Sequence, residues 1–249
     1  MPTISAIIIA KNEARDIQAC IKSVLWMDEI IVVDNGSTDE TQNICKKYTP
    51  KLQFFSTDDW PGFGKQKNRA LALANSDWVF SLDADEIVTP ELHQEIIIST
   101  KSNNFNSYKI PRSNYFLGRE MKYCLNKKDD APIRLFKKNH GKFSDDLIHE
   151  RILIDGNIGC LQHHLLHYPF YDLEELMEKC NSYSSLGAKK LFTKKVKPSI
   201  SKAIFHSLWI FIRLYILKKG ILDGWPGFLI ALSGAEGTFY KYAKLRELL

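Results

Sequence analysis

The feature that most constrains the fold is an alternation of short apolar runs with helix-like segments over the first hundred residues. Each apolar run is rich in Ile, Val or Phe and ends in polar residues, a pattern typical of buried strands. The predicted strands are residues 5–10, 29–33, 52–55 and 77–82. The predicted helices cover residues 14–25, begin again at 38, and cover 64–74 and 90–100. Such repeated strand–helix units predict a mostly parallel sheet with helices on both faces.

Acidic side chains follow three of these four strands, at the point where each strand ends. Glu13 follows the first strand, Asp34 the second, and Asp83 and Asp85 the fourth. Ligands of parallel α/β sheets bind outside the carboxyl ends of the strands. We therefore expect these four side chains to converge on one site, although they are far apart in the sequence.

The pair Asp83 and Asp85 has the chemistry of a divalent-cation site. Two carboxylates separated by one residue can bind Mg²⁺ or Mn²⁺, and a bound diphosphate would complete the shell of oxygen ligands. One pair of opposite unit charges about 4 Å apart contributes roughly 4 kcal/mol at an effective dielectric constant of about 20, so a cation would stabilise a departing diphosphate. The alternative is a solvated turn that caps the following helix. The position of the pair after a buried strand, with Asp34 and Glu13 at matching ends, favours the cation site.

Charge is unevenly distributed along the chain. The 249 residues carry a net charge of +5, but residues 186–249 contain 12 Lys and Arg against 3 Asp and Glu. The remaining residues contain 22 basic and 26 acidic side chains, a balance of −4. An acidic front needs cations of its own, whereas a basic tail suits anionic lipid or nucleic acid.

The length of the chain predicts one α/β catalytic domain with a smaller C-terminal appendage. The N-terminus lacks basic residues ahead of its first apolar run, unlike a secretion signal. The five cysteines are an odd number and include no C-x-x-C pair, which predicts a reducing, cytosolic setting.

The tail contains two apolar stretches, residues 203–217 and 221–233. Neither reaches the roughly 20 residues that a membrane-spanning helix needs, and Arg213 interrupts the first. Aromatic residues near Lys218 and Lys219 predict instead a helix that lies at an anionic membrane surface. The alternative is that the apolar faces pack on the catalytic domain and the lysines are solvated.

Several runs of sequence resemble the family 2 glycosyltransferases, which have the GT-A fold. Over residues 4–91 these runs are S-A-I-I-I-A-K-N-E, V-V-D-N-G-S-T-D, K-Q-K-N-R-A-L and F-S-L-D-A-D-E. The later runs D-D-L-I-H-E-R, L-L-H-Y and R-L-Y-I-L-K-K-G-I-L-D-G resemble bacterial lipopolysaccharide or lipooligosaccharide core glycosyltransferases, in particular β-1,4-glucosyltransferases that act on inner-core heptose. The resemblance implies a metal-dependent, inverting transferase that uses a UDP-sugar donor.

The resemblance also implies the fold class and the division of the chain. The fold class is α/β, with a mostly parallel GT-A (Rossmann-like) sheet flanked by helices and a C-terminal helical, basic and aromatic appendage. The GT-A catalytic domain would cover residues 1–170, with a nucleotide-sugar half at about 1–105 and an acceptor half at about 106–170. Residues 171–249 would form the helical region that contacts a membrane surface.

Carried over position by position, the resemblance assigns a nucleotide-sugar site. Glu13 and Asp34 would line the pocket for the base and the ribose. Lys67 would lie near the base or the diphosphate, with a solvated helix residue as the alternative. Asp83 would contact the ribose or the metal, and Asp85 would be the main ligand of Mn²⁺ or Mg²⁺.

An inverting transfer needs a base that removes the proton of the acceptor hydroxyl. The candidates lie in residues 145–151, where Glu150 is favoured and Asp146 is the alternative. Family members usually place the base in an acidic pair, whereas the local pattern here is His-Glu. Arg134 and Arg151 would neutralise the diphosphate, because a guanidinium suits phosphate oxygens; each could instead be a surface ion-pair partner.

A downstream histidine completes the metal site in many GT-A enzymes. His167 is the first candidate for this ligand and His149 the second. Cys160, His163 and His164 lie close to His167 in the sequence, but no second metal-binding pair accompanies them, so a structural zinc site is not expected. The alternative for His167 is a histidine that is hydrogen-bonded beside the pocket.

The resemblance implies a hexosyltransferase that moves a hexose, with glucose favoured and another UDP-hexose left open as the donor, to a lipid-linked inner-core oligosaccharide. Its predicted location is cytoplasmic and peripheral, on the inner face of the cytoplasmic membrane, with anionic lipid and no nucleic acid as a partner. Another lipid-linked or protein acceptor stays open. A nucleotidyltransferase would need a glycine-rich phosphate loop after the first strand, and residues 11–13 contain no glycine. A basic nucleic-acid-binding protein fits the charge of the tail, but the aromatic rings there alternate with long aliphatic runs.

Overall fold

The computed structural model describes residues 1–48, 50–102, 104–126, 130–145 and 151–248. The chain forms two units, of which the first contains Met1–Arg112 and Lys127–His167. The second contains Ser113–Asn126 and Tyr168–Leu249. The boundary between the units thus falls after His167, where residue 170 was predicted, and Ser113–Asn126 groups with the C-terminal helices rather than with the sheet.

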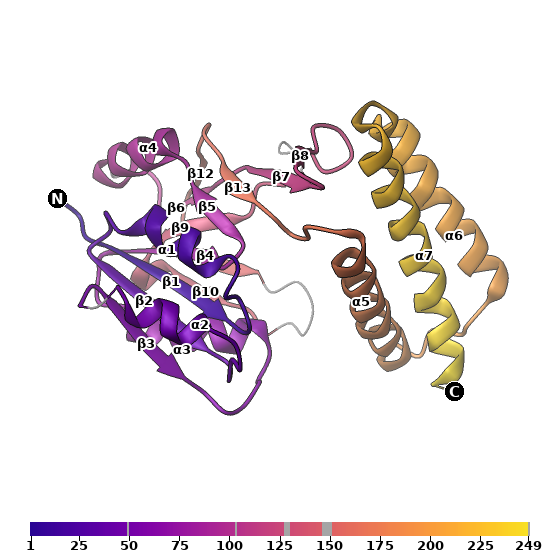
Figure 1. The fold of residues 1–249 in the computed structure, drawn as a ribbon, viewed down its shortest axis with the longest axis horizontal. Coiled ribbons are helices and arrows are strands. Elements are labelled where there is room, and N and C mark those ends of the chain that lie inside the picture. Colours follow the sequence, from indigo (N-terminus) through magenta and orange to yellow (C-terminus); the bar gives the residue numbers. More distant parts are fainter. Residues whose placement is uncertain (49, 103, 127–129, 146–150, 249) are drawn as a thin grey trace. The chain divides into compact units, whose positions relative to one another are not determined.

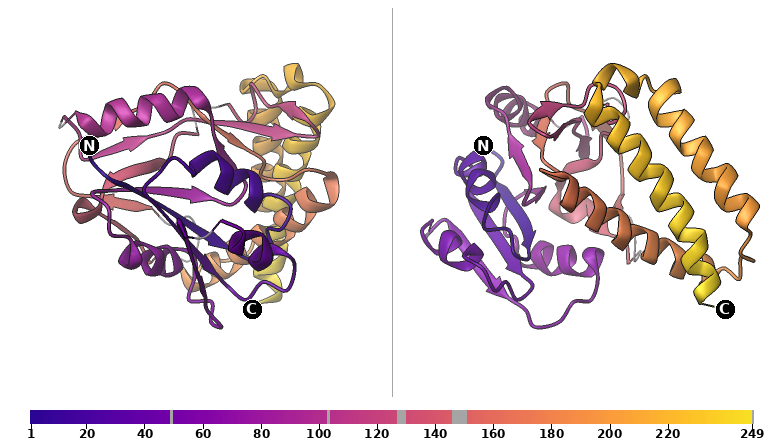
Figure 2. Two further views of the ribbon diagram at one scale, coloured as in Figure 1. Left: turned by 60° about the vertical axis from the view of Figure 1, so that its left-hand side comes forward. Right: turned by 45° about the vertical axis from the view of Figure 1, so that its right-hand side comes forward.

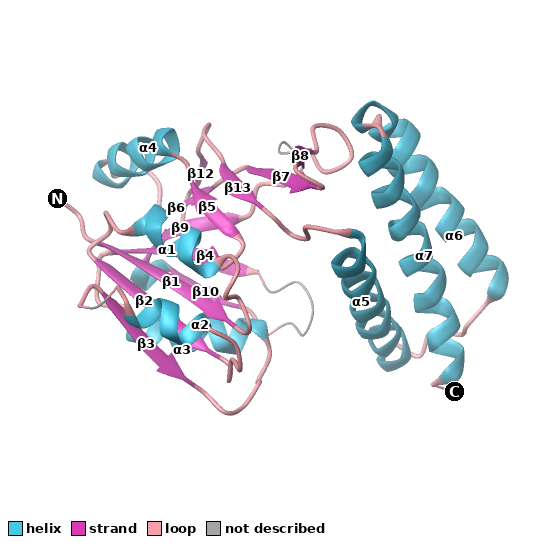
Figure 3. Ribbon diagram, viewed as in Figure 1, coloured by secondary structure: helices cyan, strands magenta, loops and turns pink. Residues whose placement is uncertain are grey.

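A seven-stranded sheet lies at the centre of the first unit (Figure 1 and Figure 3). Its described strands are β1 (Ile4–Ala10), β2 (Glu29–Asp34), β3 (Leu52–Ser56), β4 (Trp78–Asp83), β6 (Ser107–Lys109), β9 (Ile133–Lys137) and β12 (Ile158–Cys160). The spatial order is β12-β6-β9-β4-β1-β2-β3, and β1 pairs in parallel with β2 and β4. β9 runs antiparallel to its neighbours β4 and β6. The four strands predicted in the first hundred residues are confirmed, with small differences at their ends, and the sheet is mostly parallel.

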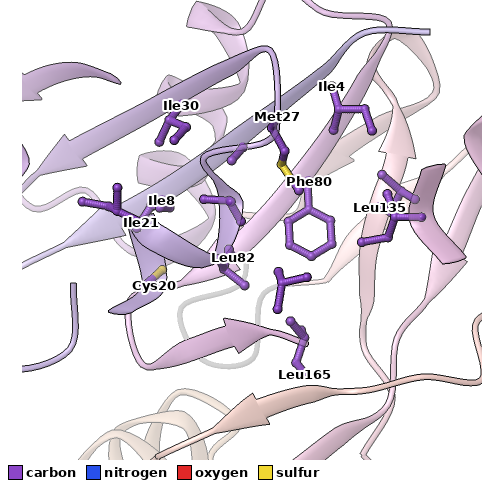
Figure 4. Packing of buried hydrophobic residues seen from close by; sticks show 14 of the residues in the cluster. Ile4, Ile8, Cys20, Ile21, Met27, Ile30, Phe80, Leu82, Leu135 and Leu165 are labelled. Carbon is purple, nitrogen blue, oxygen red and sulfur yellow. The ribbon is translucent and has the colours of Figure 1, made fainter. Parts of the chain in front are cut away.

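Helices cover both faces of this sheet because its central strands present apolar side chains to both sides. On β1, Ile4 and Ile8 face one side and Ile7 faces the other. The flanking helices are α1 (Ile17–Val24), α2 (Thr41–Lys46), α3 (Phe63–Leu73) and α4 (Pro90–Lys101). Residues of α1, α2 and α4 join the first side, where Ile8, Cys20 and Phe80 belong to one core (Figure 4), and α3 packs on the other side.

Local capping chemistry fixes where two of the helices begin. At the start of α4, the Leu92 N–H donates a hydrogen bond to Thr89 Oγ1 (3.2 Å), and Pro90 occupies the first turn. At the start of α5 (Leu173–Thr193), the Glu175 N–H donates to Asp172 Oδ1 (2.9 Å). The helix predicted over residues 90–100 is confirmed, and α5 lies in the region 171–249 that was predicted to be helical.

Shorter strands form three further pairs in the described part of the chain. In the first unit, β5 (Glu86–Val88) pairs antiparallel with β13 (Leu165–His167). There β10 (Gly141–Phe143) also pairs with β11 (Ile152–Ile154), after the single turn η1 (Lys138–His140). Tyr115 and Phe116 of β7 (Arg112–Phe116) pair with β8 (Arg119–Glu120) in the second unit. The pairing of β5 with β13 brings two chain segments together that are almost eighty residues apart, immediately beyond the end of β4.

The second unit consists mainly of three long helices. These are α5, α6 (Ile200–Ile212) and α7 (Trp225–Glu247), and the turns η2 (Arg213–Leu217) and η3 (Gly220–Asp223) connect α6 with α7. α7 lies between α5 and α6 and packs along both (Figure 2). The helical character predicted for this region is confirmed.

The helix α6 continues without a break into the π-helical turn η2, so that residues 200–217 form one helical segment of 18 residues. Within the described residues, this is the one segment long and apolar enough to cross a membrane by length and composition. The sequence argument placed its start at residue 203 and judged it too short; the structure extends it by one turn. Of its eighteen described residues only Ala203 is buried, so the segment is no core helix.

Candidate active site

The carboxyl ends of β1, β2 and β4 meet at one edge of the sheet. The register pairs Ala10 of β1 with Asp34 of β2, and Ile9 of β1 with Asp83 of β4. Neighbouring strands are about 4.8 Å apart, so Asp34 and Asp83 lie on either side of β1 with their Cα atoms about 10 Å apart. Asp85 follows in the short connection from β4 to β5. This edge therefore gathers three acidic residues, two of which, Asp34 and Asp85, are more than fifty positions apart in the chain.

Two loops at this edge are fastened to one another by hydrogen bonds. Asn12 has a left-handed backbone conformation (φ 57°), which turns the chain sharply after β1. Its Oδ1 accepts a hydrogen bond from the Thr38 N–H (2.8 Å), and its own N–H donates to Ser37 Oγ (2.8 Å). The Glu13 N–H donates to Thr41 Oγ1 (2.8 Å). The loop that carries Glu13 is thereby held against the loop that follows β2.

Asp34 is buried at the end of β2, and its carboxylate closes the loop after that strand. It accepts hydrogen bonds from the N–H of Ser37 (2.8 Å) and from the Ser37 hydroxyl. The Asp34 backbone oxygen accepts from the Thr57 N–H (2.8 Å), which joins the end of β3 to the same edge. An ionised carboxylate has about four acceptor positions, so Asp34 is fixed in place and can still accept from a bound ligand.

Two buried cations hold the side chain of Asp83. Lys67 Nζ, from α3, lies 2.9 Å from Asp83 Oδ1, and an NH2 group of Arg134, from β9, donates to Asp83 Oδ2. Burial by itself would raise the pKa of the Asp83 carboxyl, but Arg134 and Lys67 outweigh that effect and hold this pKa well below its usual range. Asp83 is therefore ionised at neutral pH.

The charge network continues beneath Asp83 into the interior. Arg134 also donates to Oε1 of Glu86 (2.5 Å), a carboxylate with 0% exposure, and Glu86 Oε2 accepts from the Asp83 N–H (3.0 Å). Arg112 lies 3.2 Å from Glu86 Oε1 and makes a bidentate pair with Asp130 (2.6 and 3.1 Å). Burial alone would lower the pKa of Arg134, but Asp83 and Glu86 raise it, so the guanidinium stays charged. Buried charges that are paired in this way hold the backbone around Asp83 in one arrangement.

Asp85 faces His167 across the β5–β13 pair. The register sets His167 opposite Glu86, the residue after Asp85, and His167 Nε2 lies 3.5 Å from Asp85 Oδ2. Both side chains are partly exposed, His167 by 12% and Asp85 by 21%. An imidazole nitrogen and a carboxylate oxygen thus converge next to the ionised Asp83, whose side chain is also partly exposed.

These donors fit a divalent cation only as a partial shell. Among the described residues, no group of three or more His, Cys, Asp and Glu side chains is arranged to hold a metal ion. Asp83 is engaged by Lys67 and Arg134, which leaves Asp85 and His167 as the two protein donors that meet. Mg²⁺ and Mn²⁺ commonly take few protein ligands and complete their shell with phosphate oxygens and water. The donor set therefore suits a cation that binds together with a diphosphate.

The described ends of the loop with the predicted bases are anchored beside Lys67. Asn68, next to Lys67 on α3, donates to the Phe143 oxygen (2.9 Å) and accepts from the Phe143 N–H (2.9 Å). The Ser144 N–H donates to the Arg151 oxygen (2.8 Å), and the Arg151 N–H donates to Ser144 Oγ (3.0 Å). Asp146, His149 and Glu150 themselves lie outside the described residues.

The glycosyl transferase family 2 model matches residues 5–147, which include nearly all of β1, the strands from β2 to β10 and all the candidate site residues named above except His149, Glu150, Arg151 and His167. The chain belongs to this family.

Relatives of this glycosyltransferase match almost its whole length. An uncharacterised glycosyltransferase of Rickettsia typhi is 33% identical over 100% of this chain and 88% of its own length. The lipopolysaccharide core biosynthesis glycosyltransferase LpsC of Rhizobium meliloti is 30% identical over 98% of this chain and 92% of its own length. Among solved structures, Staphylococcus aureus TarS in complex with UDP-GlcNAc covers 95% of this chain and 91% of its own, with a TM-score of 0.54 and 15% identity. The likeness to TarS agrees with the predicted GT-A fold, and the family favours a glycosyltransferase over a nucleotidyltransferase or a nucleic-acid-binding protein.

The structure decides between several alternatives that the sequence of this glycosyltransferase left open. Lys67 and Arg134 are each 5% exposed, so the solvated helix residue and the surface ion-pair partner are both wrong. His163, which precedes strand β13, pairs with Glu95 (2.9 Å), and His167 in β13 contacts Asp85. The five cysteines, all in the described part of the chain, are free.

Glu86, Arg112 and Asp130 are the residues of the glycosyltransferase site that sequence reasoning missed. Glu86 follows Asp85 directly, and a third acidic residue next to two metal-binding candidates was a signal of a further role. Arg112 and Asp130 gave no such signal, because only the fold brings them to Glu86. Glu86 contacts Arg134, which pairs with Asp83, and Arg112 and Asp130 extend this network from Glu86.

Proposed function

We propose that this glycosyltransferase is a metal-dependent, inverting enzyme that transfers glucose from a UDP-sugar to the inner core of lipopolysaccharide or lipooligosaccharide. The observation that carries the proposal is the convergence of Asp85 and His167 beside the ion-paired Asp83, at the edge that also bears Asp34. The name of LpsC supports the lipopolysaccharide acceptor, and TarS, which shares the fold and was solved with UDP-GlcNAc, supports a UDP-sugar donor.

The residues of the first unit divide the binding of the donor between them. Asp34 and Glu13 would accept hydrogen bonds from the base and the ribose, at the interlocked ends of β1 and β2. Asp83 would accept from the ribose, because Lys67 and Arg134 keep it ionised and fixed. Arg134, buried beneath Asp83, would act on the nucleotide through that carboxylate rather than by direct contact.

The proposed role of Asp85 and His167 follows from the charge that the leaving group, UDP, carries when it departs. Mn²⁺ or Mg²⁺ held by Asp85 and His167 would neutralise the charge on the departing UDP. His167 is positioned for this task by the pairing of β13 with β5, and Asp85 by its place directly after the fixed Asp83.

Inversion requires that the acceptor hydroxyl attack the anomeric carbon from the side opposite UDP. A carboxylate takes the hydroxyl proton while the new carbon–oxygen bond forms and the bond to UDP breaks. Glu150 is our first candidate for this base and Asp146 the second. The loop between Ser144 and Arg151 begins and ends beside Lys67, which supports a base delivered to the donor site from this loop.

The lipid-linked acceptor predicts that the enzyme works at the inner face of the cytoplasmic membrane, as a peripheral protein in the cytoplasm. The basic tail and the exposed helix α6 support a contact with anionic lipid. A spanning α6 is disfavoured, because an arginine at the centre of a bilayer costs about 3 kcal/mol on insertion scales.

Donor binding can be tested with a thermal-shift screen of UDP-glucose, UDP-galactose and UDP, each with and without Mn²⁺. A ligand that binds the native state raises the melting temperature according to its affinity. We expect UDP-glucose to raise the melting temperature only when Mn²⁺ is present, and we expect Asp85→Asn to lose this rise. The rate of glucose transfer by Asp85→Asn should fall about 100-fold or more. Asp155→Asn, which changes an exposed aspartate of the same unit, is the matched control. Equal turnover by Asp85→Asn and the control would remove the metal-dependent mechanism.

The choice of base can be tested by comparing Glu150→Gln with Asp146→Asn. Loss of the base lowers kcat by about 10²- to 10⁴-fold and leaves UDP-sugar binding intact. We expect this result for Glu150→Gln and a smaller effect for Asp146→Asn. The opposite ranking would assign the base to Asp146, and wild-type turnover in both variants would place the base outside this loop.

A further inference from the structure

The second unit exposes a row of large apolar side chains along α6 and in the turn that follows it. We call this row the apolar ridge; its members are Ile204, Phe205, Leu208, Trp209, Leu222 and Trp225. Phe205 is 69% exposed and Trp225 65%, so these side chains keep most of their surface in solvent. On α6 the members recur at intervals of three and four residues, which places them on one side of the helix. Large apolar side chains exposed in this number on neighbouring elements indicate a site of interaction.

The turn that presents Leu222 and Trp225 is a fixed structure. Between them, the Asp223 carboxylate accepts hydrogen bonds from three successive backbone N–H groups, those of residues 122–124 (2.9–3.2 Å). The backbone at Gly220 and the backbone at Gly227 approach each other closely here. Only glycine fits at position 227, because a Cβ there would lie 2.1 Å from the Gly220 oxygen. The positions of Leu222 and Trp225 are therefore fixed by hydrogen bonds and backbone packing, and these side chains are exposed in an ordered segment.

The opposite side of α6 is already packed. Ser207 Oγ donates to the Ala235 oxygen of α7 (2.7 Å), and His206 Nδ1 lies 2.8 Å from the Tyr242 hydroxyl. These contacts join α6 to α7 along its length, and α7 carries two acidic residues and three basic ones. If α6 crossed a bilayer, α7 and its charges would have to enter as well, so a position at the surface fits the structure better.

The net positive charge around the apolar ridge indicates which kind of partner binds there. Residues 194–235 contain seven Lys and Arg and a single acidic residue, Asp223, whose carboxylate is occupied by the three N–H groups. In a two-fold dimer through the ridge, the same basic surface would face itself, and like charges would repel. Anionic phospholipid headgroups complement the lysines, and the acyl region beneath them accepts the apolar side chains.

We infer that the apolar ridge inserts into the headgroup region of an anionic phospholipid bilayer, with α6 lying in the plane of the membrane. The inference rests on the proposed function in that a lipid-linked acceptor requires the enzyme at a membrane. It assigns that contact to one surface, formed by α6 and the turn η3. The lysines at both ends of α6, Lys202 and Lys218 among them, lie where they meet the phosphate layer.

The test is co-sedimentation of the full chain with vesicles of phosphatidylcholine alone or with 30% phosphatidylglycerol, about a third of the lipid, as a typical anionic surface. We expect binding to the anionic vesicles, weakened several-fold between about 0.1 and 0.5 M NaCl because salt screens the lysines. The double variant Phe205→Ser/Leu222→Ser should bind about 10-fold more weakly. Its matched control is Ile98→Ser/Met177→Ser, which removes two exposed apolar side chains from α4 and α5 (68% and 57%).

Depth of insertion separates a surface helix from a spanning one. Brominated phospholipids quench tryptophan emission, and Trp209 and Trp225 lie on the ridge. Bromine near the headgroups should quench more than bromine at the bilayer centre, and Trp209→Phe/Trp225→Phe should lose this quenching. Stronger quenching from the bilayer centre, equal loss of binding in ridge and control variants, or absence of vesicle binding would each overturn the inference. A dimer in light scattering that Phe205→Ser/Leu222→Ser dissociates would replace the bilayer by a second copy.

The vesicles contain neither donor nor acceptor, so this result is independent of sugar transfer. If vesicles bind through the ridge but no UDP-sugar shifts the melting temperature, the proposed function fails and the membrane surface stands. If Phe205→Ser/Leu222→Ser transfers glucose normally to a water-soluble, deacylated acceptor, and vesicle binding is absent in the wild type, the inference fails alone.

Discussion

Arg134 is the residue on which the buried charges of the site depend. It contacts both Asp83 and Glu86, and its removal would leave two carboxylates under-paired in the interior. Breaking a buried ion pair at one partner costs about 3–5 kcal/mol. We expect Arg134→Ala to lower the free energy of unfolding by this amount in urea at pH 7, followed by circular dichroism. Arg134→Lys should lie between, because lysine keeps the charge but cannot reach both carboxylates with one fork.

The control for this prediction is Arg69→Ala. Arg69 also makes a bidentate pair, with Asp59 at 2.7 and 2.8 Å, but this pair is exposed and should contribute little. If Arg134→Ala and Arg69→Ala unfold at the same urea concentration, the pairing of Arg134 with Asp83 does not stabilise the folded chain.

At the scale of residues, sequence reasoning could find the exposed half of the site and missed the buried half. Asp83 and Asp85 were found because their spacing after a strand is itself the signal for a cation. The burial of Lys67 was undecided, since a lysine on a short helix is usually solvated and only the fold brings Asp83 and the Phe143 ring against it. Glu86 has no pattern of its own, because its partners come from strands that the sequence does not relate to it.

At the scale of elements, Glu29 ties three strands together at the edge opposite the site. Its carboxylate accepts from Ser5 Oγ of β1 (2.6 Å), Gln53 Nε2 of β3 (3.0 Å) and the Asn75 N–H (2.9 Å). Burial alone would raise the pKa of Glu29, but the hydrogen bonds from Ser5 and Asn75 outweigh it and lower this pKa. A lowered pKa contributes stability that is present above the ordinary value of about 4.3 and is lost as the pH falls through the folded value.

We therefore expect Glu29→Gln to be less stable than the wild type by about 1 kcal/mol near pH 6.5, in proportion to the charged hydrogen bonds it loses at a partly solvated position. The difference should shrink below about pH 4, where Glu29 becomes protonated in the wild type. Urea unfolding at a series of pH values from about 3 to about 7 measures this difference in the free energy of unfolding. Glu40→Gln, an exposed acid of the same unit, is the control. A difference that stays constant with pH would contradict the lowered pKa.

In the second unit, the Asp223 carboxylate also accepts several hydrogen bonds, and these hold the turn between α6 and α7. Asp223→Ala would leave the backbone N–H groups of Lys122, Tyr123 and Cys124 without their acceptor. We expect a loss of about 2 kcal/mol in the free energy of unfolding and faster amide exchange at these three positions. Asp223→Asn keeps one acceptor oxygen and should lose about half as much. Unchanged exchange at residues 122–124 in Asp223→Ala would count against the role of this turn.

The elements themselves were predictable where burial is nearly complete. Strands β1, β2 and β4 were found because they are covered on both faces and their sequences are apolar throughout. The antiparallel position of β9 was not predicted, since its sequence resembles any short buried strand and its direction depends on the chain between β4 and β9. The start of α6 was missed for a different reason: Ser199 accepts from the Lys202 N–H and begins the helix one turn before the apolar run.

At the scale of the whole molecule, the two units have separate cores and separate chemistry. Ile8, Cys20 and Phe80 belong to the core of the first unit, whereas Phe116, Leu176 and Ile230 belong to a core of the second. The donor residues Asp34, Asp83 and Asp85 all belong to the first unit, and the apolar ridge belongs to the second. The nucleotide and the lipid surface would therefore be bound by parts of the chain whose interiors do not depend on one another.

This separation predicts how amide hydrogen exchange responds to each ligand. UDP with Mn²⁺ should slow exchange in the loops after β1, β2 and β4, because a ligand that binds only the closed form lowers the population of open forms. Exchange in α6 and η3 should stay unchanged with UDP and slow down with anionic vesicles. Asp85→Asn should abolish the first response and keep the second, and Phe205→Ser/Leu222→Ser should do the reverse. Protection of α6 by UDP in the absence of lipid would show that the units are coupled, and the nucleotide would then regulate the membrane contact.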